Sequence, residues 1–333
     1  MKLGDMGERG FLTSIRDYVK LIKEAKLGFD DDASDIPLSK EQNLLINVDT
    51  FVRKTDWLPG MSAAQVGRKT AVMALSDLAA KGARPLATML SLCVPEHYDA
   101  TEAEEIVRGF SQYCTKSGIP FIGGDMGMAL DVVVTAVAIG IAHPDTIIPR
   151  TGARPGDIIA VTGYFGLTSV AYEILINGRE AEPELAKNAL LAAYKPAIEL
   201  GIVSALAEKK AVTAAMDSSD GLGITLNTMA RQSKVAFRID DLPSARGVEI
   251  FARKNMMDEM KFVMMGGEEF LLVLTIPEDK FKEAQAIADS RHIPLIDIGH
   301  VLEGEGVVYE SSEGFVDVPS IGYDNFKEWN TLR

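Results

Sequence analysis

Hydrophobic and polar residues along the first half of the chain predict helices and strands in alternation. Apolar side chains recur at helical spacing over residues 10–26 and 101–117, and a helix rich in small residues is predicted over 62–81. Apolar runs at 44–48 and 85–95 predict strands, and the run at 131–142 predicts a buried strand. This half therefore combines helices with strands.

The second half repeats the mixture after a turn-rich segment. Residues 143–157 carry three prolines and two glycines between apolar runs, which predicts a domain boundary there and two domains, 1–148 and 149–333. Beyond it we expect strands at 158–163, up to Asp217, and within 270–277 and 294–304, and helices at 171–179, 183–194, 196–209 and from Leu222. Mixed content in both halves predicts an α/β (α+β) fold for each domain.

The charge balance changes the range of expected partners. With 34 basic against 48 acidic residues the net charge is −14, which disfavours nucleic acid and anionic membranes. The absence of a long uncharged apolar run and of a basic-then-apolar start favours a cytoplasmic protein with no membrane partner. The two cysteines, Cys93 and Cys114, are expected to be reduced thiols in or near the core. A protein this acidic that binds a nucleotide would need divalent cations to neutralise the phosphates.

Acidic and glycine-rich clusters stand in loops or at the ends of predicted strands, where binding groups usually lie. They are Asp30-Asp31-Asp32, Asp49-Thr50, Ser76-Asp77, Gly123-Gly124-Asp125, Asp217-Ser218-Ser219-Asp220-Gly221 and Gly266-Gly267-Glu268-Glu269. Gathered carboxylates repel one another unless cations bind between them, and Mg²⁺ prefers such oxygen ligands.

Each cluster also has a structural alternative. The three consecutive aspartates could form a solvated turn, the glycines before Asp125 a simple turn, and the group after Asp217 a helix N-cap. Asp77 is harder to explain in this way, because it lies inside the apolar stretch ALSDLAAKGA, where an unpaired carboxylate would be costly to bury.

Several familiar phosphate-binding and catalytic motifs are absent from the sequence. It contains no GxxxxGK[ST] loop, no protein-kinase HRDxxxxN or DFG set, and no GxGxxG between a strand and a helix. The four histidines are scattered without a metal-spaced or nucleophilic partner. If the chain binds phosphates, it does so without a P-loop, and its aspartates are the first candidates.

Taken together and in order, the clusters resemble the thiamine-monophosphate kinase family of the aminoimidazole-ribonucleotide synthetase superfamily. The resemblance runs from Gly28 to Phe326. It rests on the motifs GFDDDA, VDTFV, ALSDLAAKGARP, IGGD, RTGARPGDIIAVTG, DSSDGL, GGEEF and GYDNF. The fold that it implies has an N-terminal α/β domain (1–148) that binds ATP and Mg²⁺ and forms a homodimer, and a C-terminal α/β domain (149–333) that closes over nucleotide and substrate.

The resemblance implies ATP-dependent phosphorylation of thiamine monophosphate to thiamine diphosphate, with several Mg²⁺ ions. The implied metal ligands are Asp32, Asn47, Val48, Asp49, Asp77, Asp125, Asp217 and Asp220, of which Asp49, Asp77 and Asp125 would be catalytic. Implied ATP contacts are Gly124, Asp125, Arg150 and Ser219, and implied substrate contacts are Asp56, Glu268 and Tyr323.

Two departures from the family pattern keep other functions open. Asp56 stands where the family usually has histidine, and GGEEF replaces the usual GGEDY, which lengthens the side chain at Glu269 by one methylene. A non-catalytic nucleotide-binding protein is one alternative. Another enzyme of the superfamily, a selenophosphate synthetase or a hydrogenase-maturation enzyme, is the other, although the cysteines expected near the N- or C-terminus of those enzymes are missing.

Overall fold

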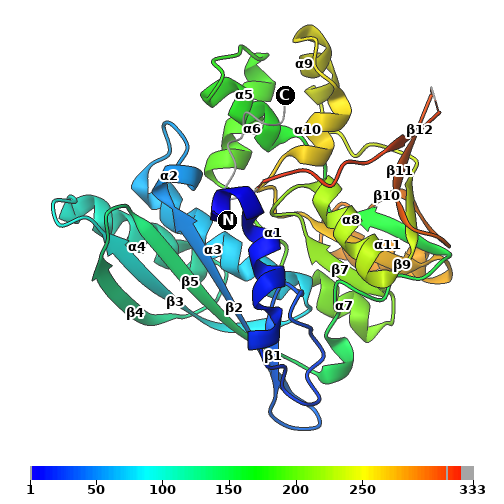
Figure 1. Cartoon of the computed structure of the whole chain (residues 1–333), viewed down its shortest axis with the longest axis horizontal. Helices are drawn as coiled ribbons and strands as arrows, with labels where there is room; N and C mark the ends of the chain where they lie inside the picture. The colour runs from blue at the N-terminus through cyan, green and yellow to red at the C-terminus, as the bar shows by residue number, and fades with distance from the viewer. Residues whose placement is uncertain (1, 313, 324–333) are drawn as a thin grey trace.

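The computed structural model describes residues 2–312 and 314–323, and within them the strands form two sheets. Figure 1 shows the sheets side by side, with the N-terminal helix α1 (Leu3–Ile15) lying across the region between them. Strands β1 to β5 make the first sheet and β6 to β12 the second. The final residues of the GYDNF motif, 324–326, lie outside the described part of the chain.

The first sheet has the order β1-β2-β5-β3-β4 and is covered on one face by helices. Its strands are β1 (Ser34–Pro37), β2 (Asn43–Val52), β3 (Arg84–Val94), β4 (Phe121–Met128) and β5 (Val133–Ala142). Its helices are α2 (Arg53–Asp56), α3 (Ala63–Ala80) and α4 (Ala100–Lys116). Strand β5 alternates buried and half-buried residues, as expected for a sheet with helices on one face only.

Helices α3 and α4 cross at very short range because glycines face each other's backbone. A Cβ added at Gly67 would lie 1.8 Å from the Ile106 carbonyl oxygen, and one at Gly109 would lie 1.9 Å from the Ala64 carbonyl oxygen. No side chain fits there without displacing a helix. The crossing therefore fixes the position of α3, which lines the cleft described below.

The second sheet is covered on both faces and has the order β12-β11-β8-β10-β6-β9-β7. Its strands are β6 (Asp157–Val161), β7 (Ala214–Asp217), β8 (Ala236–Ile239), β9 (Leu272–Pro277), β10 (Ile296–Leu302), β11 (Gly306–Ser311) and β12 (Gly314–Asp317). The helices of this half are α5 (Leu167–Leu175), α6 (Pro183–Tyr194), α7 (Ile202–Glu208), α8 (Leu222–Ser233), α9 (Val248–Lys254), α10 (Glu259–Met265) and α11 (Phe281–Ser290). Core residues of α8 and α10 pack on one face of the sheet and those of α7 and α11 on the other.

Most predicted elements are present, and both sheets mix parallel with antiparallel pairs, which confirms the α/β (α+β) fold. Two helices were predicted too long. The helix expected over 10–26 spans Leu3–Ile15, with a short 3-10 turn to Tyr18, because Val19, Leu21 and Ile22 are exposed and no packing supports further turns. The helix expected over 196–209 begins only at Ile202.

No helix in the described ranges is both long and apolar enough to cross a membrane.

Candidate active site

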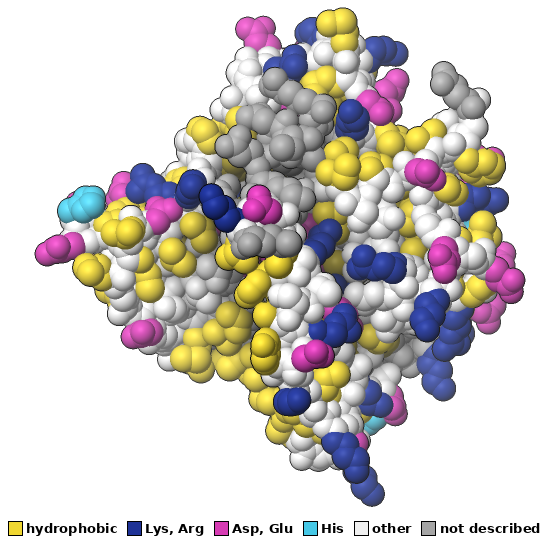
Figure 2. Space-filling model, in the orientation of Figure 1, with side chains coloured by type: hydrophobic (Ala, Val, Ile, Leu, Met, Phe, Trp, Pro, Cys, Tyr) yellow, Lys and Arg dark blue, Asp and Glu magenta, His cyan; other side chains and the backbone are white. Residues whose placement is uncertain are grey.

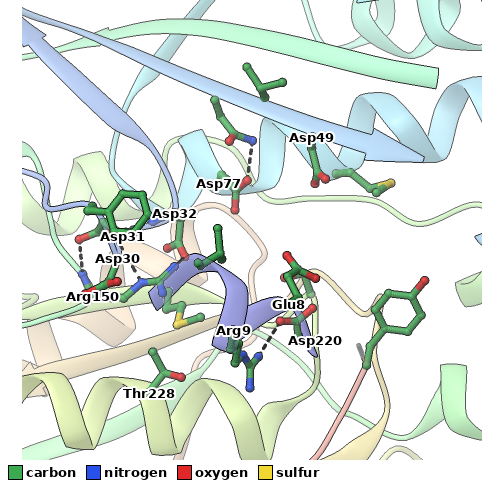
Figure 3. A pocket seen from close by; sticks show the side chains of 18 of the residues that line it. Glu8, Arg9, Asp30, Asp31, Asp32, Asp49, Asp77, Arg150, Asp220 and Thr228 are labelled. Carbon is green, nitrogen blue, oxygen red and sulfur yellow. Dashed lines mark hydrogen bonds and ion pairs between the residues drawn. The ribbon is translucent and has the colours of Figure 1, made fainter. Parts of the chain in front are cut away.

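A cleft of about 720 Å³ lies where the two halves of the chain meet. Helix α1 lines one side, and the loop around Asp32, strand β2 and helix α3 line another. The segments around Ser219 and Glu268 close it from the second half. Figure 3 shows that many of the labelled side chains that line it are acidic. The predicted site residues are thus largely gathered in one place.

Helix α3 carries four residues on one face at intervals of four, of which Met73 and Asp77 line the cleft. They are Lys69, Met73, Asp77 and Lys81, the last immediately after the helix as its C-cap residue. Residues four apart lie on nearly the same face of a helix, and twelve residues advance about 18 Å along its axis. The stripe therefore runs from Lys69 at one end of the cleft to Lys81 at the other, with Asp77 in between.

Three carboxylates from distant segments converge beside the middle of this stripe. Ligand oxygens of Asp32, Asp77 and Asp217 all lie within 4.8 Å of one another. Asn47 Nδ2 donates to Asp77 Oδ2 at 2.5 Å, and Ser76 Oγ donates to Asp217 Oδ2 at 2.5 Å. Helix α3 and strand β7 thus carry two of these carboxylates, and the loop before β1 carries Asp32.

The electrostatics of this cluster favour a bound cation. Burial raises the pKa of Asp77 well above its usual value, and repulsion from Asp217 and Asp32 adds to the effect. Burial likewise raises the pKa of Asp217 to about 7 and that of Asp49 to about 6. Close, hard oxygen donors whose ionised forms are disfavoured fit a divalent cation such as Mg²⁺, which would offset the repulsion.

Asp31 and Asp32 differ from the other carboxylates because basic side chains of the chain itself neutralise them. Lys81 Nζ lies 2.7 Å from Asp31 Oδ1 and 2.8 Å from Asp32 Oδ2. The Arg150 guanidinium pairs with Asp32 and lies 3.8 Å from Asp31 Oδ1. Burial opposes the charged form of Asp32, but Arg150 and Lys81 outweigh it and lower the pKa of this carboxyl.

The opposite end of the cleft holds the three predicted substrate contacts. Tyr323 Oη donates to Asp56 Oδ1, and the backbone N–H of Val52 donates to Asp56 Oδ2 at 2.6 Å. Glu268 pairs with Lys69 and accepts a hydrogen bond from Tyr172 Oη at 2.5 Å. Asp56, which stands in place of the family's histidine, therefore holds the tyrosine rather than pointing away from it.

The remaining predicted residues divide between the cleft and a distant strand. Val48, Asp49, Ser219 and Asp220 line the cleft. Gly124 and Asp125 lie exposed on β4, the far edge of the first sheet.

Strand register places Asp125 on the open face of that sheet. Asp125 is in register with Ser91, Ser91 with Thr135, and Thr135 with Thr50, so these side chains share a face. Asp49 and Thr50 are neighbours on β2 and point to opposite faces, with Asp49 on the side covered by helices. Asp125 is three strand spacings, about 14 Å, from Thr50. It does not join the aspartate cluster of its own chain.

Lys69, Lys81, Asp31 and Tyr172 were not predicted from the sequence. A signal for the two lysines was present, since both lie in the same apolar segment as Asp77, and a buried ammonium needs partners as much as a buried carboxylate does. Asp31 could not be told from its two neighbours, because consecutive aspartates in a loop carry no periodicity.

Two family models match the chain, those for the N-terminal domain of AIR synthase related protein over residues 30–142 and for its C-terminal domain over 154–310. A thiamine-monophosphate kinase from Nitrosopumilus maritimus is 33% identical over 316 residues, covering 93% of this chain and 99% of that protein. The structure described as AaThiL complexed with AMPPCP and TMP has a TM-score of 0.82 at 23% identity and covers 98% of this chain and 99% of that one. Hydrogenase maturation protein HypE in complex with ATP has a TM-score of 0.70 at 20% identity, covering 97% of this chain and 98% of that one. At these identities the two structures show a shared fold.

Proposed function

The chain belongs to the thiamine-monophosphate kinase family of AIR synthase related proteins, and on that basis we propose that it transfers the terminal phosphoryl group of ATP to thiamine monophosphate, giving thiamine diphosphate and ADP. One observation carries the proposal. A single cleft joins a cluster of carboxylates suited to cations with a second group of residues, Asp56, Glu268 and Tyr323, suited to an organic acceptor.

The acceptor end is built to bind and orient rather than to remove a proton. A phosphate oxygen of thiamine monophosphate is already anionic near neutral pH, so the reaction requires no strong general base. Lys69 and Tyr172 fix the Glu268 carboxylate, and Asp56 fixes the Tyr323 ring. We assign Glu268 to the cationic part of the substrate and Tyr323 to its heteroaromatic ring.

The donor end would hold the nucleotide and its cations. We assign Asp32, Asn47, the main-chain oxygen of Val48, Asp49, Asp77, Asp217 and Asp220 to Mg²⁺, and Arg150 and Ser219 to ATP. Bound Mg²⁺ would screen the two polyanionic substrates from each other. The contribution of the chain is positional, because α3, β7 and the loop before β1 bring the carboxylates close together.

The direct test incubates the purified chain with ATP, Mg²⁺ and thiamine monophosphate and separates the products by chromatography. We expect thiamine diphosphate and ADP in equal amounts, and none when EDTA replaces Mg²⁺ or unphosphorylated thiamine replaces the acceptor. Nucleotide binding without thiamine diphosphate would favour the non-catalytic alternative. ATP hydrolysis that does not depend on the acceptor would favour another enzyme of the superfamily.

We further propose that the chain acts as a homodimer and that Asp125 serves the site of the partner subunit. The open face of the first sheet carries an apolar row across three strands, Val48, Val137 and Met89. Figure 2 shows hydrophobic side chains gathered over this part of the molecule. Beside the row, edge strand β4 exposes Ile122, and its exposed Met126 and Met128 are in register with Leu92 and Val94 on the other face. An apolar face next to an unpaired edge suits a second copy of the chain, which would carry Gly124 and Asp125 to the neighbouring cleft.

Mixing two inactive variants tests this arrangement. We expect Asp77→Asn and Asp125→Asn each to lose turnover by orders of magnitude while folding normally. A dimer that contains one chain of each kind would have one intact site, so an equal mixture should recover roughly a quarter of wild-type turnover. A mixture that stays inactive although mass measurement detects hybrid dimers would place Asp125 outside the partner's site.

We also propose a cytoplasmic location for the protein. Cys93 and Cys114 are both free thiols, which suits a reducing compartment. Secretion of the native protein into an oxidising medium by its own host would contradict this assignment.

A further inference from the structure

Lys81 is fully buried at the C-terminal end of α3, and its ammonium group meets three acceptors. Asp31 Oδ1 lies at 2.7 Å, Asp32 Oδ2 at 2.8 Å and the carbonyl oxygen of Ala215 at 2.7 Å. The contact with Ala215 is a hydrogen bond, and the contacts with the two carboxylates are ion pairs. The group is therefore held in one position, between the loop of the first half and strand β7 of the second.

Two carboxylates at ion-pair distance favour the charged form of this lysine. Together with Arg150, the ammonium brings two positive charges to two carboxylates. The Asp31–Asp32 pair is thus neutral as a group without any bound ion.

The neutral pair adjoins the carboxylates that have no such partner. Asp32 lies in the trio with Asp77 and Asp217, whose oxygens are within 4.8 Å of one another. No ion pair with a lysine or arginine is found for Asp77 or Asp217 in the part of the chain that the structure describes. One side of the trio therefore carries a built-in cation, and the other side does not.

We propose that Lys81 is a positioning residue that stands in place of one divalent cation at the Asp31–Asp32 end of the cleft. It thereby confines exchangeable Mg²⁺ to the side of Asp32 that faces Asp77 and Asp217. This inference rests on the proposed magnesium-dependent function, and it goes further by assigning one cation position to the chain itself. An ordinary structural ion pair would make no difference to the number of ions bound.

The number of bound Mn²⁺ ions distinguishes a lysine that replaces a divalent cation from a lysine in an ordinary structural ion pair. Mn²⁺ binding would be counted by electron paramagnetic resonance, with and without a non-hydrolysable ATP analogue, in wild type and in Lys81→Met, which keeps an unbranched stem and removes the charge. We expect the variant to bind one additional Mn²⁺ per chain, because two carboxylates are then left with only Arg150. An unchanged number of ions with unchanged affinity would overturn the proposal.

Two control variants isolate the cause. The double variant Asp31→Asn/Lys81→Met removes one charge of each sign and should bind as many ions as wild type. Lys69→Met makes the same substitution at the other fully buried lysine of this segment, at the far end of the cleft, and should also leave the number unchanged. An additional ion in either control would mean that the effect does not come from the freed Asp31–Asp32 pair, and would overturn the proposal.

Loss of folding is also informative. If Lys81→Met is unfolded in EDTA, millimolar Mn²⁺ should restore a cooperative melting transition, because a divalent cation replaces the ammonium. Failure of Mn²⁺ to restore it would overturn the proposal. Ion counting needs no turnover, so a chain that gains the additional Mn²⁺ but forms no thiamine diphosphate would contradict the proposed function and leave this inference standing.

Discussion

The middle of the cleft differs from both of its ends in how buried negative charge is treated. At one end Lys69 pairs with Glu268, and at the other Lys81 and Arg150 pair with Asp31 and Asp32. In the middle, Asp77 receives a neutral hydrogen bond from an asparagine amide, and the pKa of this carboxyl is raised. The chain supplies its own cations where a carboxylate must stay fixed. It leaves charge unbalanced where an exchangeable cation is expected to bind.

The largest effect should come from the unbalanced middle. Asp77→Asn should reduce kcat by at least about 100-fold, because a group that organises transition-state charge is lost. Melting in EDTA should be unchanged or higher, since burial and repulsion oppose the ionised form of Asp77. Turnover at saturating Mg²⁺ and a melting curve measure both. Undiminished turnover would remove Asp77 from the site.

A carboxylate that is paired with a buried lysine should, unlike Asp77, contribute to stability. Asp31→Asn leaves the buried Lys81 ammonium with one carboxylate partner, and we expect a loss of about 3 kcal/mol in the free energy of unfolding. Denaturant titration in EDTA measures it. The matched control is Asp30→Asn, whose exposed pair with Arg16 should contribute less than about 1 kcal/mol. Equal losses in the free energy of unfolding of the two variants would show that the buried ion pair stabilises the protein no more than the exposed one.

Glu269 is a third case, in which a bound proton rather than a cation neutralises a buried carboxylate. Burial raises its pKa to about 8 even though the Gly166 backbone N–H donates to it at 2.8 Å. Because the folded state holds this proton more tightly than the unfolded state, the group's contribution to stability falls as pH rises from about 4.5 to about 8. Glu269→Gln should remove this fall and be more stable than wild type at pH 9 by on the order of 2 kcal/mol.

Denaturant titrations of wild type and Glu269→Gln between pH 4.5 and pH 9 test whether the free energy of unfolding of wild type falls as pH rises. Parallel curves for the two proteins would mean that Glu269 is ionised throughout.

The smallest effect is expected at the surface of the cleft. Arg9 and Asp220 lie 2.8 Å apart, but their side chains are 47% and 39% exposed. Arg9→Ala should therefore change the free energy of unfolding by less than about 1 kcal/mol, and 0.5 M salt should remove most of the difference. A loss as large as that of Asp31→Asn would show that helix α1 is part of the folded core rather than a cover over the cleft.

Sequence pattern predicted the fold better than it predicted the partners of charged groups. The apolar periodicity of α3 and the carboxylate inside it pointed to Asp77, because burying a lone charge is costly whatever the fold. Lys81 pairs with Asp31 and Asp32 in a loop about fifty residues earlier in the chain. The spacing of residues near Lys81 could not predict this ion pair. Asp125 was expected beside Asp77 because the motif alone does not reveal which face of a sheet its strand presents.

The backbone contact between α3 and α4 also limits how this protein can vary. Gly67 and Gly109 leave no room for a side chain, so direct backbone contact sets the spacing between α3 and α4. A methyl group at either glycine would have to push the two helices apart, and α3 carries Lys69 and Asp77 and ends at Lys81. Substitutions at Gly67 and Gly109 would thus be disfavoured because they would change the shape of the cleft, although neither residue lines it.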